Sequence, residues 1–471
     1  MPNFDDANIE KLFGADDAEN ERPERFKEYF YYNLAYESLI SELPVRILVG
    51  HKGVGKSALL KRAYISDQEE SKPCIWLRPD ALLNVQSATR AEDQFIQRIE
   101  IWKRGILLEV ITEFFGEDTM RVAPELRNAK AKDLIRLLIK GLDEWKKGDI
   151  LTHPAAINIY IDDIDRGWSA SLVDIKNISA LLNAMRDIGG QEQRIRFRIG
   201  LRSDVYFLVR TSDESTDKIE RNIIWLRWTN DEVLRLAAKR IATFFSMNIS
   251  QDKIDKLNQI DISRTILSKV IDPEFKGRGH WDNRPIHNVL LSLTRARPRD
   301  LIKLFHLAAK RAHAKGADVI ASTHLEASFE TYSQERLQDI INEFKSELPD
   351  IDRLLLSMKP SKRERKTALS YQFTTDALSV KLNNIISQNR FRFTNGRPIT
   401  AKSLIQFLYK IDFITARKDS SSGEIDRKFF DEGRFLASEV ADFGYNWEIH
   451  PAYRWALQPH DVQTLLDSLF S

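Results

Sequence analysis

The chain has 471 residues, which predicts about three domains, and its 42 % hydrophobic and 30 % charged residues are typical of a globular protein with a sizeable core. With 71 Lys and Arg against 69 Asp and Glu, the net charge of +2 gives no global attraction to nucleic acid or to an anionic membrane. Any affinity for nucleic acid therefore has to come from a local patch.

A single cysteine, Cys74, excludes an internal disulfide and a thiolate-rich metal site. The amino-terminal stretch is acidic and lacks the apolar region of a signal peptide, and no run of about 18 apolar residues occurs. We therefore expect a cytoplasmic protein that has no contact with a membrane. The scattered histidines show no metal-ligand spacing, so no zinc site is expected.

The first expected element is a helical segment at the amino terminus, residues 1–44. Its aromatic stretch FKEYFYYNLAYESLI contains Tyr31, Tyr32 and Tyr36. These side chains either flank an adenine base or pack a helix against the core, and helix packing is the favoured interpretation.

A strand, a glycine-rich turn and a helix follow within residues 45–57, where VRILV leads into GHKGVGKS. This is the context that makes the phosphate-loop pattern G-x-x-x-x-G-K-[ST] specific. Its glycines allow backbone angles that turn successive N–H groups toward an anion at a helix start. Lys56 is expected to reach the β- and γ-phosphates of ATP, and Ser57 to ligate Mg²⁺. The predicted nucleotide-binding residues of this loop are Gly50, Gly53, Val54, Gly55, Lys56, Ser57 and Ala58.

The run INIYIDDIDRGW, residues 157–168, predicts a buried strand that delivers carboxylates at its carboxyl end. Asp162 is the expected second magnesium ligand beside Ser57, and Asp163 is the expected general base that polarises the attacking water. Asp165 is interpreted as a helix cap or a loop ion-pair partner. The two adjacent acids favour hydrolysis of a nucleotide over binding alone.

The segment RIRFRIGLRSDVYFLV, residues 194–209, predicts a further strand. Arg202 follows its end and is the candidate sensor of a γ-phosphate, with a structural ion pair to Asp204 as the alternative. Beyond the loop TSDESTDKIERN, Arg221 is a candidate arginine finger directed at a neighbouring subunit. The alternative for Arg221 is an ordinary solvated arginine.

Helical periodicity continues from Thr229 into the 340s and predicts an all-helical lid. Within it, TRARPRDLIKLF places Pro298 in a first helical turn, flanked by Arg297 and Arg299. We expect one of these two guanidinium groups to contact the γ-phosphate and to couple its loss to rotation of the lid. A basic solvent face is the alternative.

The remaining residues, 346–471, are predicted to form a winged-helix-like α+β domain. ITAKSLIQFLYKIDFITARKD indicates a helix and a short strand, SSSGE a turn, and NWEIHPAYRWAL another strand. The basic stretch KPSKRERKTA is a candidate phosphate-binding face, although its alternation with Glu364 favours a solvated face. Its basic residues are Lys359, Lys362, Arg363, Arg365 and Lys366.

The ordered set of segments over roughly residues 20–345 resembles the bacterial FunZ-type P-loop ATPases, relatives of the AAA+ and STAND ATPases with an Orc-like layout. The segments are GHKGVGKSALLKRAY, IYIDDIDRGW, GLRSDVYF, IIWLRWTNDEVLRLAAKRI, RPRDLIKLF and YSQERLQDIINEF. The resemblance implies an ASCE-type parallel sheet with an extra strand between the phosphate-loop strand and the Asp162 strand. It also implies a lid that carries a sensor arginine, and nucleotide-dependent self-association.

The resemblance further implies a setting in bacterial antiphage defence, beside a separate effector protein. In Orc-like proteins a winged-helix domain binds duplex DNA, whereas in STAND-type proteins it packs against the ATPase core as a switch. Two features depart from the pattern. Many AAA+ members have Glu at the position of Asp163, and because Asp is the shorter base, this departure implies slow turnover. The second departure is that the trans arginine has no clear match.

We therefore expect four parts: an amino-terminal helical segment (1–44), an α/β P-loop ATPase core (45–226), a helical lid (227–345) and a winged-helix-like domain (346–471). The expected function is that of a Mg²⁺-dependent ATPase whose nucleotide state controls homo-oligomerisation and a partner effector. One alternative is a DNA-associated, initiator- or loader-like ATPase. Another is an ATP-bound scaffold that does not hydrolyse ATP and sequesters a toxic partner.

Overall fold

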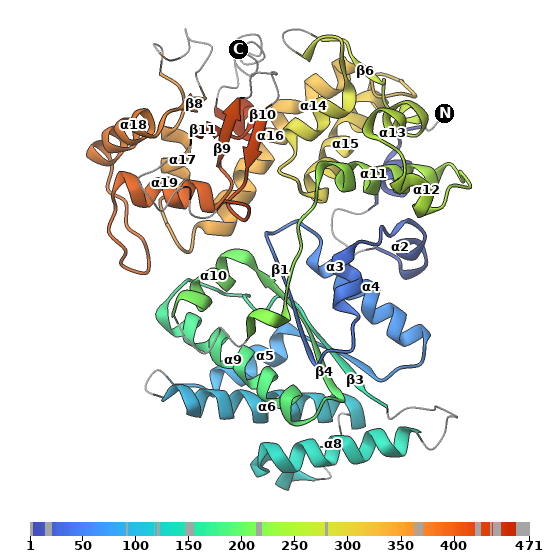
Figure 1. Ribbon diagram of the computed structural model, residues 1–471, viewed down its shortest axis with the longest axis vertical. Helices are drawn as coiled ribbons and strands as arrows, with labels where there is room; N and C mark the ends of the chain where they lie inside the picture. The colour runs from blue at the N-terminus through green and yellow to red at the C-terminus, as the bar shows by residue number, and fades with distance from the viewer. Residues whose placement is uncertain are drawn as a thin grey trace. The chain divides into compact units, whose positions relative to one another are not determined.

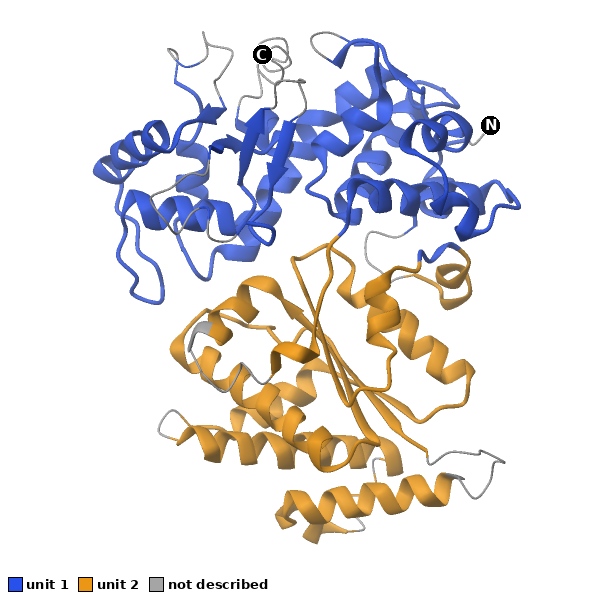
Figure 2. Cartoon of the chain, in the orientation of Figure 1, with its two compact units in different colours: residues 1–16, 29–31, 228–471 blue, residues 17–28, 32–227 orange. Residues whose placement is uncertain are grey.

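The structure, a computed structural model, describes residues 3–14, 21–90, 93–116, 118–119, 123–146, 155–212, 219–277, 281–361, 364, 371–419, 425–433, 436 and 444–457. The chain divides into two compact units (Figure 2). Residues 17–28 and 32–227, orange in the figure, form the core unit, which contains the phosphate loop. Residues 1–16, 29–31 and 228–471, in blue, form the lid unit.

A five-stranded parallel sheet forms the middle of the core unit, in the order β2–β3–β4–β1–β5 (Figure 1). Because β4 lies between β1 and β3, the extra strand predicted between the phosphate loop and Asp162 is confirmed. Strands covered on both faces are apolar almost throughout, which explains the runs VRILV and INIYI. The strands are β1 (Val45–Gly50), β2 (Cys74–Leu77), β3 (Ile157–Ile161), β4 (Ile195–Arg202) and β5 (Ile223–Trp225).

Helices cover both faces of this sheet, which confirms the predicted α/β class (Figure 1). On one face lie α3 (Leu34–Leu39) and α4 (Lys56–Glu69), preceded by α2 (Pro23–Tyr29). On the other lie α5 (Pro79–Ser87), α6 (Phe95–Phe115), α9 (Leu172–Gln191) and α10 (Ser203–Ser212), with η2 (Pro124–Asn128) and α8 (Ala131–Lys146) following α6. Across the described parts of both units, no helix combines the length and apolar character needed to cross a lipid bilayer.

The lid is helical, as the periodicity predicts. Its first helix begins with a capping box: Glu232 N donates to Thr229 Oγ1 (3.2 Å), while the Thr229 N–H donates to the Glu232 carboxylate (2.8 Å). The lid also contains a short antiparallel pair that was not predicted, β6 (Glu274–Phe275) with β7 (Arg284–Pro285). Strands of two residues are too short to give an alternating pattern in the sequence. The helices are α1 (Asp6–Phe13), which packs on α11 and α15, then α11 (Asn230–Phe244), α12 (Gln251–Asp255), α13 (Gln259–Thr265), η4 (Leu267–Lys269), α14 (Ile286–Leu293), α15 (Pro298–His313) and α16 (Ser322–Phe344).

The carboxy-terminal elements follow the helix–strand–helix–helix–hairpin order of a winged helix, as predicted. Their antiparallel sheet has the order β10–β9–β11–β8. The predicted SSSGE turn and the basic residues Lys362, Arg363, Arg365 and Lys366 lie outside the described residues. The elements are α17 (Ile351–Ser357), β8 (Gln372–Phe373), α18 (Thr375–Gln388), α19 (Ala401–Lys410), β9 (Ile414–Asp419), β10 (Ile425–Lys428), β11 (Asn446–Ile449), η8 (Pro451–Tyr453) and α20 (Arg454–Leu457).

Candidate nucleotide-binding site

The loop between β1 and α4 has the geometry of an anion-binding turn. Gly53 and Gly55 have φ angles of 81° and 101°, which residues with side chains rarely adopt. A Cβ at Gly50 would lie 2.8 Å from Val54 Cγ2 and 3.0 Å from the Leu226 carbonyl oxygen, so the close packing there requires glycine. The loop is therefore shaped to present backbone N–H groups to an anion at the start of α4.

Lys56, the first residue of α4, folds back over this loop. Its Nζ donates to the carbonyl oxygens of Gly50 (2.9 Å) and His51 (3.0 Å). These bonds hold the ammonium group beside the loop, where the predicted contact with the β- and γ-phosphates requires it. Of the other predicted loop residues, Val54 is buried and Ala58 lies in the first turn of α4.

Asp162 follows β3, and its carboxyl group accepts a hydrogen bond from the side chain of Ser57. Asp162 is 6 % exposed, and its Oδ2 has no hydrogen-bond partner among the described residues. Burial raises the pKa of Asp162, against the opposing effects of the Ser57 hydrogen bond and the Lys56 charge. A divalent cation would pair the orphaned oxygen and offset the cost of burying the carboxylate. Ser57 and Asp162 thus fit the predicted magnesium ion.

Gly200, in the middle of β4, makes room for this carboxyl group. A Cβ at Gly200 would stand 2.3 Å from Asp162 Oδ1 and 3.1 Å from Leu60 Cδ1. Sequence reasoning missed this residue. The available signal was an isolated glycine within an apolar strand, which indicates the close approach of another group.

Asp163 has surroundings that differ from those of its neighbour. Its φ angle is 52°, in the left-handed region that Asp tolerates better than most residues, and its side chain is exposed. The turn at Asp163 therefore leaves its carboxylate open to water, while Asp162 stays buried. Water access is what a general base needs, and the assignment of Asp163 as the base stays a prediction.

Arg202 ends β4 between two carboxylates. Its Nε and Nη2 donate to Asp204 Oδ1 (3.0 Å) and Oδ2 (2.8 Å), and Nε lies 3.4 Å from Asp165 Oδ2. The ion pair with Asp204 is thus present, and Asp165 is an ion-pair partner. Burial raises the pKa of Asp165 to about 6, against the opposing charge of Arg202. Because Arg202 pairs in register with Gly50, it lies beside the phosphate loop, and its role as a sensor stays a prediction.

Arg221 lies in a short turn just before β5, the strand at the edge of the sheet next to β1. Its side chain is exposed. An exposed arginine at a sheet edge is accessible to a neighbouring subunit, and the finger role stays a prediction.

The two arginines that flank Pro298 have different surroundings within the lid unit. Arg297 is 3 % exposed and donates through Nη2 to Asp412, in the turn before β9. Arg297 therefore does not belong to a basic solvent face. Arg299, in the first turn of α15, is half-buried. Contact of either guanidinium group with a γ-phosphate stays a prediction.

The amino-terminal tyrosines take part in packing. Tyr32 and Tyr36 make an edge-to-face ring contact with centroids 5.2 Å apart, and Arg62 Nε donates to Tyr32 Oη (3.0 Å). Tyr31 belongs to the lid unit, where its hydroxyl donates to Asp255 Oδ1 (2.8 Å). These contacts agree with the interpretation that the tyrosines pack helices, which the sequence favours over contact with an adenine base.

A phosphate loop after β1, a buried acid at the end of β3 and a strand inserted between the two define a P-loop NTPase of the ASCE class. Within the lid unit, residues 231–341 match the family model of the FunZ-associated C-terminal helical domain. The match confirms the resemblance to FunZ-type P-loop ATPases that the sequence indicates.

The chain is also similar to two known protein sequences. The transposon gamma-delta 80.3 kDa protein of Escherichia coli (strain K12) is 23 % identical over 328 residues, which cover 66 % of this chain and 42 % of that protein. Allergen Alt a 2 of Alternaria alternata is 26 % identical over 144 residues, 31 % of this chain and 67 % of the allergen. The chain thus spans less than half the length of the transposon protein.

Among solved structures, the Aeropyrum pernix ORC2 protein in its ADPNP–ADP complexes is similar at a TM-score of 0.42 and 11 % identity, covering 90 % of this chain and 87 % of that chain. The Thermotoga maritima RuvB Holliday junction branch migration motor is similar at a TM-score of 0.31 and 13 % identity, covering 89 % of this chain and 96 % of that chain. The class of the core follows from its own strand order and loop.

Proposed function

We propose that this protein is an ATPase that binds ATP with Mg²⁺, hydrolyses it and self-assembles according to its nucleotide state. The observation that carries the proposal is Asp162, which is buried beside the phosphate loop and hydrogen-bonded to Ser57, while its Oδ2 has no partner within the described residues. Bound Mg²⁺ neutralises phosphate charge and orients the β- and γ-oxygens.

The residues of the chain contribute mainly positioning and charge, which is what phosphoryl transfer requires. The loop N–H groups and the Lys56 ammonium hold the phosphates, and Ser57 and Asp162 hold the cation. Asp163 accepts the proton of the attacking water. Because Asp is shorter than Glu, the base stands further from the water than in many AAA+ enzymes, and we expect slow turnover.

The test is ATP hydrolysis by Lys56→Ala compared with Lys52→Ala, two lysines of the same loop. Lys56→Ala should abolish nucleotide binding or turnover, because the loop loses the cation that offsets the phosphate charge. Lys52, an exposed loop residue, should tolerate the change. Equal rates in wild type and Lys56→Ala would rule out this assignment of the loop.

We further propose that the ATPase is a regulatory component of bacterial antiphage defence that acts beside a separate effector protein. The support is the resemblance to FunZ-type ATPases, including the FunZ-associated domain at residues 231–341. Co-purification with the product of an adjacent gene, in ATP and not in ADP, is the expected result. No nucleotide-dependent partner among adjacent gene products would contradict this part of the proposal.

A DNA-associated ATPase is the second candidate, favoured by the winged-helix order and by the name of the transposon relative. Its weakness is α19, the helix that would enter the major groove. Most side chains of α19 are buried, and Lys410 pairs with Glu347 at 2.6 Å. Turnover that rises with duplex DNA and falls steeply with salt would favour this candidate.

ATP left intact after long incubation would instead indicate a scaffold that does not hydrolyse ATP.

A further inference from the structure

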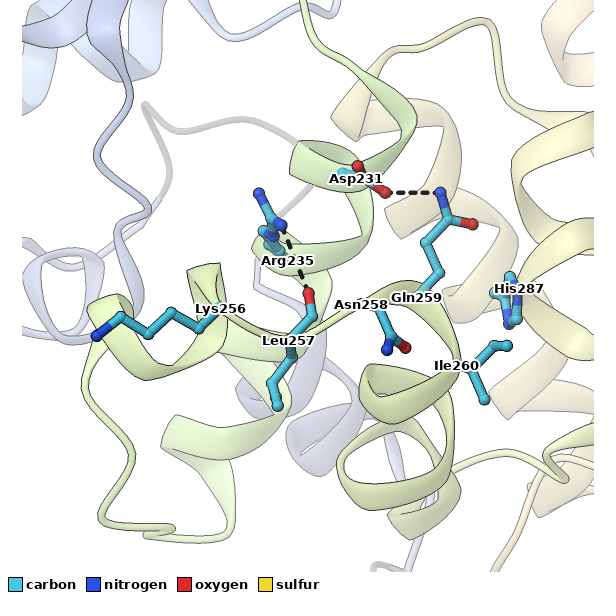
Figure 3. A pocket seen from close by; sticks show the side chains of 8 residues that line it. All are labelled: Asp231, Arg235, Lys256, Leu257, Asn258, Gln259, Ile260 and His287. Carbon is cyan, nitrogen blue, oxygen red and sulfur yellow. Dashed lines mark hydrogen bonds between the residues drawn. The ribbon is translucent and has the colours of Figure 1, made fainter.

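A pocket in the lid unit plays no part in the proposed ATPase chemistry (Figure 3). Its volume is about 490 Å³, within the range of roughly 300–1,000 Å³ typical of small-molecule sites. Its walls come from α11, the α12–α13 segment and α14. All of its lining residues lie within 231–341, the part that matches the FunZ-associated domain.

His287, on α14, is the buried polar group of this pocket. It is 4 % exposed, and its Nδ1 has no hydrogen-bond partner among the described residues. Burial lowers the pKa of His287, so the imidazole is neutral near pH 7 and offers one donor and one acceptor. An unpaired buried polar group is costly, and a polar ligand in the pocket would provide the missing partner.

Arg235 and Lys256 give the pocket a positive side. Arg235 Nε is also buried and has no hydrogen-bond partner in the part of the chain that the structure describes, and Nη2 reaches the Leu257 carbonyl oxygen only at 3.4 Å. The lining carboxylate, Asp231, already accepts a hydrogen bond from Gln259 Nε2 (2.6 Å; Figure 3). The lining thus contains two cationic side chains and one partly engaged carboxylate, and this charge balance favours an anionic ligand.

We propose that this pocket binds a small polar molecule that carries an oxyanion, either a phosphate ester or a carboxylate. The oxyanion accepts hydrogen bonds from Arg235 and Lys256, and a hydroxyl group of the same molecule pairs with His287. Among the described lining residues there is no Phe, Tyr or Trp, and the imidazole of His287 is the single aromatic ring, so the pocket lacks a broad aromatic surface on which a nucleobase could stack. A sugar phosphate or a small carboxylic acid therefore suits it better than ATP. This site stands independently of the ATPase proposal.

The test is calorimetric titration of the full-length Lys56→Ala chain, in which the phosphate loop lacks its cation, with glucose 6-phosphate and with citrate. Glucose serves as the uncharged control. Binding of glucose 6-phosphate without citrate identifies a phosphate-ester site, and the reverse identifies a carboxylate site. Binding of glucose as tight as that of the anions, or no binding of either anion at millimolar concentration, overturns the proposal.

Substitutions in the same background test the assignment of the residues. Arg235→Gln should weaken binding about tenfold or more, because a charge-assisted hydrogen bond is lost. Asp231→Asn should tighten binding, since it removes a negative charge while the remaining amide oxygen can still accept a hydrogen bond from Gln259. An increase in affinity is a readout that damage to the fold would not produce.

Lys256→Gln and Lys253→Gln form a matched pair of exposed lysines three residues apart, of which only Lys256 lines the pocket. Lys256→Gln should weaken binding severalfold and Lys253→Gln should leave it unchanged. If Arg235→Gln fails to fold, this exposed pair still decides the question. Equal losses in both variants would mean that the anions respond to general surface charge, and the proposal would be wrong.

Discussion

Asp162 and Asp163 are adjacent carboxylates that the backbone turns into different surroundings. Asp162 is buried against Ser57, whereas Asp163 has a positive φ angle and an exposed side chain. A metal ligand benefits from a fixed, water-poor position, while a base that activates water must meet solvent. One strand end thereby provides both environments.

Asp163→Asn should leave ATP affinity nearly unchanged and lower turnover by about 10² to 10⁴. The reason is that Ser57 and Asp162 still hold the cation while the proton acceptor is lost. Separate measurements of ATP affinity and of single-turnover hydrolysis check this expectation. A fall in affinity as large as the fall in rate would make Asp163 a ligand and not the base.

Gly200→Ala should weaken Mg²⁺-dependent nucleotide binding, because the new Cβ collides with Asp162 Oδ1 at 2.3 Å. Overpacking of this kind also lowers stability by about 1–3 kcal/mol. Gly190→Ala is the control, since a Cβ there meets nothing within 4 Å and the residue lies in α9. Thermal unfolding with and without Mg²⁺ and ADP measures both effects. If the two variants lose cation-dependent stabilisation equally, Gly200 has no special role.

At the level of the elements, α15 is joined to its surroundings by buried ion pairs. Arg295 donates to both oxygens of Asp300 (2.7 and 2.8 Å), and Arg336 of α16 donates to Asp300 Oδ1 (2.9 Å). Arg295 Nη1 also donates to the Tyr453 hydroxyl group (2.7 Å). Removing one member of such a network leaves buried charges unpaired, so each contact holds the others in place.

Asp300→Asn should destabilise the lid unit by about 3–5 kcal/mol near pH 7. Burial alone would raise the pKa of Asp300, but Arg295 and Arg336 hold it well below its usual value. The stabilisation is therefore complete above the unfolded-state pKa of about 3.9 and is lost as the pH falls further. The difference in unfolding temperature between wild type and variant should accordingly shrink below about pH 4.

Exposed Asp318 provides the control for this series. Asp318→Asn should change the unfolding temperature little at either pH, because surface charges contribute little to stability. A gap between wild type and Asp300→Asn that stays constant as the pH falls would mean that the carboxylate charge is not what stabilises α15.

Short sequence patterns predicted those elements whose structure depends on neighbouring residues in the chain. The phosphate loop, the acid-bearing strand and the helix that follows Thr229 each depend on residues only a few positions apart, and they are found where expected. The strand order came from the resemblance and is confirmed. Contacts between distant residues were missed: Gly200 depends on a carboxylate from another strand, and Arg297 pairs with Asp412, 115 residues away. Neither sequence position carries a periodic signal of its partner.

For the whole molecule, the central expectation is assembly that depends on nucleotide. If Arg221 acts in trans, the next subunit completes the catalytic site around the ATP bound at one phosphate loop. The mass of the protein in solution should then be higher with ATP or a non-hydrolysable analogue than with ADP. A trans arginine contributes about 10³ to 10⁵ in rate in related phosphoryl-transfer systems. Arg221→Ala should therefore assemble poorly or hydrolyse ATP far more slowly.

Mixing Arg221→Ala subunits with Lys56→Ala subunits provides the decisive experiment. Each variant is expected to be inactive alone, yet a mixed interface pairs an intact phosphate loop from the first with an intact Arg221 from the second. Activity should partly return. No recovery at any ratio, with mixed assembly verified by mass, would exclude Arg221 as a finger in trans.

The contact between Arg297 and Asp412 has a mechanical consequence for such an assembly. The guanidinium group belongs to the start of a lid helix and the carboxylate to the winged-helix domain, and both are almost fully buried. Separating the two would strand opposite charges in a medium of low dielectric constant. If nucleotide rotates the lid, as we propose, the winged-helix domain should move together with it, and so should whatever surface that domain presents.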